Sequence, residues 1–336
     1  MSTINVDNVN PQSGNAVNVN GIELRSLAGG PGTVNKYIGA SAPTSLTANA
    51  NLMVGSGGSG ITTGNNNTAL GLFCAGSLTT GEDNVIAGTG ALSVTNFGSY
   101  NVAIGRNALQ LVTNPFGEVA IGWYANQSFT TATTGPNTAV GYRALWNNLT
   151  GGFNTVLGSE AGAYITTGSN NTYLGAGSGL SATTGSNNTC IGLNSTPATP
   201  TTSNSITLGN SSNNVLRCAV TTITSLSDAR DKKEIEELPV GLEFVEKLKP
   251  VKFTWDDRNE EGKHDVEDFG FIAQDLKASQ EEANASYLGL VYEENPEKLE
   301  ASYGKLLPVL VKAIQELSSE VKSLKEELET LKANNK

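Results

Sequence analysis

The stretch Asn101-Val-Ala-Ile-Gly-Arg-Asn-Ala-Leu109 decides the fold, because close copies of it recur along the first two thirds of the chain. The copies share the pattern Asn-Thr/Val-x-Ile/Leu/Val-Gly, and its glycine returns every 17 residues, with one step of 19. These glycines are Gly71, Gly88, Gly105, Gly122, Gly141, Gly158, Gly175, Gly192 and Gly209. Such a period, rich in Gly, Asn and Thr, indicates a β-solenoid in which each coil hydrogen-bonds to the next.

Each coil is expected to contain two short strands and two turns, with Asn and Gly at the corners and Thr and Asn facing water. Its alternating Val/Ala and Ile/Leu positions supply only a thin apolar stripe for one chain. A small residue also follows three positions after most of the repeat glycines. These residues are Ala91, Ala108, Ala125, Ala144, Ala161 and Ser178. Small residues at a fixed phase let neighbouring solenoids approach closely, so we predict a homotrimer.

These phrases, including Asn204-Ser-Ile-Thr-Leu-Gly209, resemble the head repeats of trimeric autotransporter adhesins and of related phage tail fibres. The resemblance covers residues 60–212 and implies a stiff stalk or display surface. An aromatic set lies in the same region, and sugar rings stack on aromatic faces. The set is Phe73, Phe97, Phe116, Trp123, Tyr124, Tyr142 and Trp146, of which the last four are the candidate receptor-binding residues. The alternative is that these rings only fill turns.

Charged residues are distributed unevenly between two parts of the chain. Only 16% of the residues are charged, and residues 1–226 carry six acidic and five basic side chains, whereas residues 227–336 carry 26 and 16. The net charge of −11 argues against binding to nucleic acid or to an anionic membrane surface. The sequence shows no signal peptide and no apolar run long enough to insert into a membrane.

Cofactor and metal sites are not expected. The three cysteines, Cys74, Cys190 and Cys218, are widely separated, so we predict small buried residues rather than a disulfide framework or a CxxC metal site. His264 is the single histidine, which excludes a His-rich zinc site. A polysaccharide-degrading site would need paired carboxylates, but Glu82, Asp83, Glu118 and Glu160 share no phase in the repeat.

The last segment carries an independent signal for association. From Leu307 its apolar positions follow steps of three and four, which is a heptad seam typical of a coiled coil. The seam is Leu307, Leu310, Ile314, Leu317, Val321, Leu324, Leu328 and Leu331. The seam predicts a trimeric coiled coil over residues 305–332 that brings three chains into register. The alternative is one amphipathic helix packed on its own domain.

The segment before this helix contains Ser227-Asp-Ala-Arg-Asp-Lys232, helical signals over Leu238–Leu248, a strand signal over Val251–Trp255, and Phe269-Gly-Phe-Ile-Ala-Gln-Asp-Leu276. This ordered set resembles the peptidase S74 family, the intramolecular chaperone of endosialidases and other tailspikes, from Ser227 to about Leu331.

The resemblance implies that Ser227 is the nucleophile, that Lys232 is its general base, and that the chain is cut once, between Ser227 and Asp228. It also implies supporting roles for Asp228, Arg230, Gly270 and Gln274. Relatives with a histidine two residues before the motif glycine differ from this chain, which has Asp268 there.

A lysine can accept a serine proton when burial or nearby positive charge lowers its pKa. Attack by Ser227 on its own carbonyl would form a strained four-membered ring, whereas attack on the carbonyl of Leu226 would close a five-membered ring. Both routes remain open. A purely structural alternative is that Ser227 and Asp228 cap the following helix.

Together these features predict a mainly β fold, a trimeric β-roll of 17-residue repeats, followed by an α+β chaperone domain and a coiled coil. The expected parts are an attachment or capping region at 1–50, a Gly/Ser linker at 51–62, the roll at 63–212, a neck at 213–226 and the chaperone at 227–336. A virion tail fibre or spike is expected, bound through its N-terminus to tail or baseplate proteins and binding a host glycan or protein. The alternatives are a secreted trimeric adhesin and a polysaccharide-degrading tailspike.

Overall fold

The computed structural model describes residues 17–19, 22–28, 34–38, 48, 50–55, 61–128, 135–213, 215–219, 225–256 and 264–335. The chain divides into two compact units, Met1–Asn210 and Ser211–Lys336. Most of the predicted attachment region at 1–50, and residues 56–60 of the predicted linker, lie outside the described residues.

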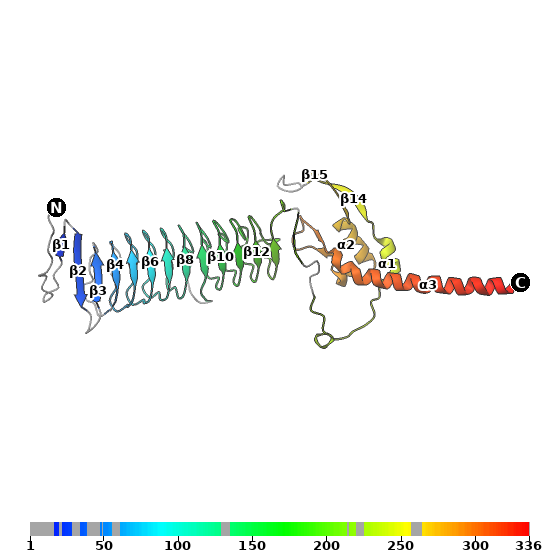
Figure 1. Cartoon of the computed structure of the whole chain (residues 1–336), viewed down its shortest axis with the longest axis horizontal. Helices are drawn as coiled ribbons and strands as arrows, with labels where there is room; N and C mark the ends of the chain where they lie inside the picture. The colour runs from blue at the N-terminus through cyan, green and yellow to red at the C-terminus, as the bar shows by residue number, and fades with distance from the viewer. Residues whose placement is uncertain are drawn as a thin grey trace. The chain divides into compact units, whose positions relative to one another are not determined.

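The first unit is the predicted β-solenoid (Figure 1). Its sheet of 13 strands follows chain order, so each strand pairs with the strand that comes next in the sequence. Strands β1 (Val17–Val19), β2 (Ile22–Ala28) and β3 (Val34–Ile38) pair antiparallel. From β3 onward every pairing is parallel, and residue pairs such as Val102 and Val119 keep the 17-residue register.

The parallel strands are three residues long. They are β4 (Leu52–Val54), β5 (Thr68–Leu70), β6 (Val85–Ala87), β7 (Val102–Ile104), β8 (Val119–Ile121), β9 (Thr138–Val140), β10 (Thr155–Leu157), β11 (Thr172–Leu174), β12 (Thr189–Ile191) and β13 (Ile206–Leu208). Each coil therefore contains one strand, and the expectation of two is wrong. The remainder of the coil is turn backbone, which still hydrogen-bonds to the next coil, as from Leu92 N to Ala108 O at 3.0 Å.

A narrow apolar core runs inside the solenoid of a single chain. The middle residue of each strand from β4 to β12 is buried, as Ala103 and Val156 are, and meets small and aliphatic residues from the facing turn. The alanines that follow the repeat glycines, such as Ala108 and Ala144, are fully buried within their own chain. These alanines fill the core, so they are not available for contact between chains as the sequence analysis expected.

The repeat glycines are required by the neighbouring coil. Gly105 has φ +122°, and a Cβ on it would lie 2.5 Å from the carbonyl oxygen of Gly122 in the next coil. Gly158 has φ +144° and meets the carbonyl of Gly175 in the same way. A left-handed backbone and a close approach both exclude a side chain, which explains the strict phase of these glycines.

The asparagine that opens each repeat phrase is buried, although the sequence analysis placed Asn at corners or facing water. Asn154 Nδ2 donates to Asn137 Oδ1 at 3.1 Å and to the Gly168 carbonyl at 2.9 Å. Asn154 Oδ1 in turn accepts from the backbone N–H and Nδ2 of Asn171, at 3.0 and 3.1 Å. The same ladder includes Asn51, Asn67, Asn84, Asn101, Asn137, Asn154, Asn171 and Asn188. Its bonds satisfy polar groups that water cannot reach.

The corner role belongs to a different residue, the one before the ladder position. Asn170 and Asn187 have φ of 60° and 57°, a left-handed conformation that Asn tolerates better than most residues. The same corner carries Tyr100 and Phe153 in other coils, with φ of 61° and 58°. The expectation that Asn forms the turns is therefore confirmed for these corner positions.

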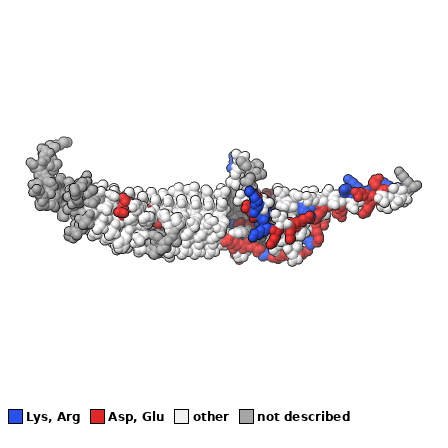
Figure 2. Space-filling model, turned by 90° about the horizontal axis from the view of Figure 1, so that it is seen from below, with Lys and Arg blue, Asp and Glu red and all other residues white. Residues whose placement is uncertain are grey.

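The second unit combines short helices with two small sheets. Its elements are η1 (Ala229–Asp231), α1 (Leu242–Lys247), β14 (Val251–Asp256), β15 (His264–Gly270), α2 (Ala273–Glu282), η2 (Ser286–Leu288), β16 (Val291–Tyr292), β17 (Glu300–Ala301), η3 (Tyr303–Leu306) and α3 (Leu307–Asn334). Strands β14 and β15 pair antiparallel, as do β16 and β17. Figure 2 shows that charged side chains gather over this unit, whereas few colour the visible face of the solenoid.

Helix α1 is shorter than the predicted span of Leu238–Leu248 because it begins only after Gly241 and ends before Pro250. The Glu316 carboxylate of α3 accepts a hydrogen bond from the Leu242 N–H at 2.7 Å and so satisfies the start of α1. Phe244 of α1 is buried together with Leu276, Leu306 and Val309 in the core of this unit.

Candidate functional site

The segment Ser227–Lys232 brings the predicted nucleophile and base together. Lys232 Nζ lies 2.5 Å from Ser227 Oγ and 3.3 Å from the Ser227 carbonyl oxygen. The 3-10 turn η1 between them folds the chain back, so that side chains five residues apart meet. Both residues are exposed in the single chain.

Asp228 closes the start of this turn. Its carboxylate accepts from the Arg230 backbone N–H at 2.9 Å, which is the cap that the structural alternative predicted for this segment. The Arg230 guanidinium also binds the carboxylate, with Nε–Oδ1 at 3.0 Å and Nη2–Oδ2 at 2.6 Å. This guanidinium, together with the Arg230 backbone N–H, holds the pKa of Asp228 below its ordinary value. The pair thus orients the residue that follows Ser227.

The contact between Ser227 and Lys232 has the geometry that a serine–lysine pair needs. A neutral lysine amine at this distance can accept the hydroxyl proton and leave an alkoxide as the nucleophile. The same Nζ reaches the carbonyl of the Ser227–Asp228 peptide bond, where an ammonium group would stabilise developing negative charge. Nζ contacts the hydroxyl and the carbonyl of Ser227, the two groups that the route through its own carbonyl uses, whereas attack on the Leu226 carbonyl would break the Leu226–Ser227 bond instead.

Gly270 and Gln274 lie apart from this contact in the hydrogen-bond network. Gly270 ends β15, and a Cβ on it would lie 2.7 Å from the Tyr303 hydroxyl. Gln274 is exposed on the first turn of α2. Within the described ranges, no hydrogen bond or ion pair joins either residue to Ser227 or Lys232. The structure gives Gly270 a role in packing against Tyr303, whereas its predicted support of the Ser227–Lys232 pair stays a prediction.

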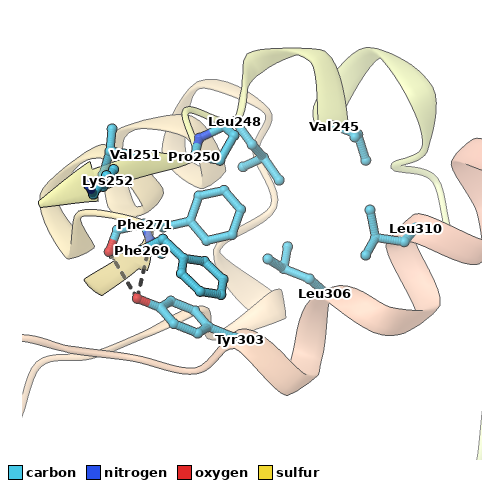
Figure 3. A pocket seen from close by; sticks show the side chains of 11 residues that line it. Val245, Leu248, Pro250, Val251, Lys252, Phe269, Phe271, Tyr303, Leu306 and Leu310 are labelled. Atoms are coloured by element: carbon cyan, nitrogen blue, oxygen red, sulfur yellow. Dashed lines mark hydrogen bonds between the residues drawn. The ribbon is translucent and has the colours of Figure 1, made fainter. Parts of the chain in front are cut away.

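An apolar pocket lies beside Gly270, between α1, the β14–β15 sheet and the start of α3 (Figure 3). The Tyr303 hydroxyl accepts from the Phe271 N–H at 3.2 Å and donates to the Phe271 carbonyl at 3.1 Å. The Phe269 side chain, which lines the pocket, is 82% exposed. Leu310 belongs both to the pocket lining and to the heptad seam.

One segment of the second unit is similar to a known family. Residues 227–284 match the family model described as chaperone of endosialidase. The matched chaperone segment begins at Ser227 and includes the Ser227–Lys232 contact, η1, α1, the β14–β15 sheet and α2 up to its end. Comparison with curated proteins and with solved structures gave no match.

The heptad seam that follows the chaperone segment is open to solvent. Its eight side chains are between 40% and 66% exposed in the single chain. The face of α3 that packs on its own unit is a different one, formed by Val309 and Ala313. The alternative of a single helix packed on its own domain explains those two residues but leaves the seam without a partner.

The four candidate receptor-binding aromatics form one cluster on the solenoid. The Trp123 ring stacks on Tyr124 with centroids 5.3 Å apart and meets Tyr142 edge-on at 5.5 Å. Trp146 joins the cluster through Arg143, whose guanidinium lies 5.2 Å from the Tyr142 ring centroid and 4.6 Å from that of Trp146. Trp123 and Tyr142 are 46% and 37% exposed, so the cluster is partly open to solvent.

Sequence reasoning missed the arginines of this cluster. Arg106 lies 5.8 Å from the Trp123 ring centroid, and Arg143 lies 3.9 Å from Glu160. A signal was present, because Arg106, Trp123 and Tyr142 each directly follow a repeat glycine and therefore stack in successive coils. The cluster thus combines aromatic faces with two cations.

Metal-binding clusters and membrane-spanning helices are both absent from the part of the chain that the structure describes. No group of three or more His, Cys, Asp or Glu side chains there is placed to hold a metal ion. No helix there has the length and apolar character needed to cross a bilayer. Cys74 and Cys190 are buried free thiols, as expected, whereas Cys218 is exposed.

Proposed function

We propose that the chain is a trimeric fibre or spike protein of a virus particle, assembled by a C-terminal intramolecular chaperone that cuts itself off between Ser227 and Asp228. The carrying observation is the order of the parts, since a long β-solenoid precedes the chaperone segment. The N-terminal region attaches the fibre to tail or baseplate proteins.

Trimerisation is supported by the exposed heptad seam. Eight aliphatic side chains that are 40–66% exposed would be unfavourable on an isolated helix. Three such helices bury the seam in a coiled coil. The endosialidase chaperone family is associated with trimerisation, so the partner of the seam is two further copies of this chain.

Cleavage is tested by expressing the full chain as wild type and as Ser227→Ala, with Ser225→Ala as a matched control two residues away. Denaturing mass analysis should give two fragments, 1–227 and 228–336, for the wild type and for the control. The Ser227→Ala chain should stay whole while native mass analysis still gives a trimer. A whole wild-type chain would remove the protease role, and a monomer would remove the fibre.

Receptor binding is proposed for the cluster of Trp123, Tyr124, Tyr142 and Trp146, with host glycan as the ligand class. Solvent-exposed ring faces bind the apolar faces of sugars, and Arg143 supplies hydrogen-bond donors at their edge. On an array of surface oligosaccharides, Trp123→Ala should lose a binding signal that Phe97→Ala keeps, because Phe97 is exposed elsewhere. Equal signals from both variants would place receptor binding elsewhere.

A further inference from the structure

One coil breaks the asparagine ladder. Glu118 stands where the neighbouring coils have Asn101 and Asn137, and it opens the coil that is two residues longer than the others. Its backbone N–H donates to Asn101 Oδ1 at 2.9 Å, and its Oε2 accepts from the Asn137 N–H at 3.0 Å. The glutamate therefore continues the ladder, but its side chain is fully buried.

A second exchange accompanies the first in the same coil. Asn126 lies four residues after the repeat glycine, where other coils place the buried apolar residues Leu92, Leu109 and Leu145. Asn126 is also fully buried, and its Nδ2 donates to Glu118 Oε2 at 3.0 Å. In this coil Glu118 thus replaces the ladder asparagine, and Asn126 replaces the buried leucine.

Two oxygens of this pair have no hydrogen-bond partner in the part of the chain that the structure describes. Glu118 Oε1 and Asn126 Oδ1 are both buried without a hydrogen bond among the described residues. An ionised carboxylate and an amide oxygen are both acceptors, so they cannot bond to each other. Leaving two acceptors buried and unsatisfied is costly, whereas a single proton on Oε1 would satisfy both.

We propose that Glu118 is protonated in the folded solenoid and forms a cyclic acid–amide pair with Asn126. In this pair Glu118 Oε1–H donates to Asn126 Oδ1, and Asn126 Nδ2–H donates to Glu118 Oε2. Burial acts in the same direction, because desolvation raises the pKa of Glu118 from 4.5 to about 8 despite its hydrogen bonds to Asn137 and Asn126. The pair therefore makes the stability of one position in an otherwise uncharged ladder depend on pH.

Other titratable groups near this coil lie on its outer surface. They are Tyr100 and Arg106 in the preceding coil, Tyr124 in the same coil, and Tyr142 and Arg143 in the following coil. Within the described part of the chain, none of them forms a hydrogen bond or ion pair with Glu118. The ionised form of Glu118 would therefore have no ion-pair partner among the described side chains.

The proton makes the stability of the solenoid depend on pH in a defined window. Below about pH 4.5 the carboxyl is protonated in both the folded and the unfolded chain, so it contributes no pH dependence. Between pH 4.5 and about 8 only the unfolded chain ionises, and each pH unit lowers the folding equilibrium constant about tenfold. Above this window both states are ionised and the loss is complete.

The experiment compares the full chain with Glu118→Gln, whose amide can form both bonds of the pair without titrating. Infrared difference spectra between the two proteins at pH 6 should show the carbonyl band of a carboxylic acid in the wild type. As the pH is raised from 5 to 8, the denaturant midpoint of unfolding should decrease for the wild type relative to the midpoint of Glu118→Gln. The matched control Glu82→Gln, at a partly exposed glutamate, should keep the wild-type pH dependence.

Carboxylate bands in place of the acid carbonyl at pH 6 would overturn the proposal and point to a bound cation instead. Parallel midpoint curves for wild type and Glu118→Gln would overturn it as well. If Glu118→Gln does not fold, the double variant Glu118→Asn/Asn126→Leu restores the repeat of the neighbouring coils. That variant should fold and should lose the pH dependence, and retained dependence would again refute the protonated pair.

Discussion

Replacing Asn154 by alanine measures what the buried ladder contributes. The substitution removes donors to Asn137 Oδ1 and to the Gly168 carbonyl, and it removes the acceptor of the Asn171 N–H. Asn137 Oδ1 still accepts from the backbone N–H of residue 154 at 3.0 Å. Asn171 Nδ2 also loses a bond but still donates to the Gly185 carbonyl at 3.0 Å, so the Gly168 carbonyl and the Asn171 backbone N–H are the two groups left without a partner among the described residues.

Each buried polar group left unsatisfied costs about 1–3 kcal/mol, so the free energy of unfolding should fall by roughly 2–6 kcal/mol per chain. Circular dichroism during chemical denaturation measures this change. The control is Asn147→Ala, because the Asn147 side chain forms no hydrogen bond among the described residues and should change stability by less than about 0.5 kcal/mol. Equal losses for the two variants would show that the ladder does not stabilise the solenoid.

Two further predictions concern the core and the seam. Gly179→Ala should destabilise the solenoid by roughly 2–4 kcal/mol in thermal denaturation. The reason is that Gly179 has φ +62° and that the new Cβ would lie 2.2 Å from the Tyr173 ring. The control Gly76→Ala meets only ordinary contacts and should be tolerated. Leu317→Asp should weaken trimer formation roughly 100-fold or more in sedimentation experiments, since it would bury an unpaired carboxylate, and Ser318→Asp, off the seam, should not. A trimer unchanged by Leu317→Asp would refute the coiled coil.

The repeat made the solenoid predictable from sequence. Each coil needs a glycine in a left-handed conformation against the next coil, so glycine recurs in the sequence at a nearly constant spacing of 17 residues. It was harder to predict which side chains point into the solenoid and which point to solvent. Asn171 and Asn170 are neighbours of the same type, yet one forms the buried ladder and the other the exposed corner. Composition treats both as turn residues, and only the path of the backbone separates them. The same limit led to the assignment of the alanines to a contact between chains.

The candidate catalytic contact was predictable because Ser227 and Lys232 are close in sequence and one turn suffices to join them. Contacts between distant segments were not. Glu316 caps the start of α1 at Leu242 from 74 residues away, and Tyr303 binds Phe271 from 32 residues away. No period or motif links such residues, since their meeting depends on how α1, β15 and α3 pack.

The departures from the repeat carry information that the repeat itself lacks. A solenoid of identical coils could pair one coil out of step, because every strand would meet an equivalent partner. Tyr173 opposes such a slip, since its ring occupies space that glycine leaves at positions 162 and 179. A shift by one coil would bring leucine or another larger residue toward that ring. Glu118 acts similarly, because Asn126 offers it a side-chain amide where neighbouring coils have Leu109 and Leu145. These irregular coils specify one register among many that the 17-residue pattern allows.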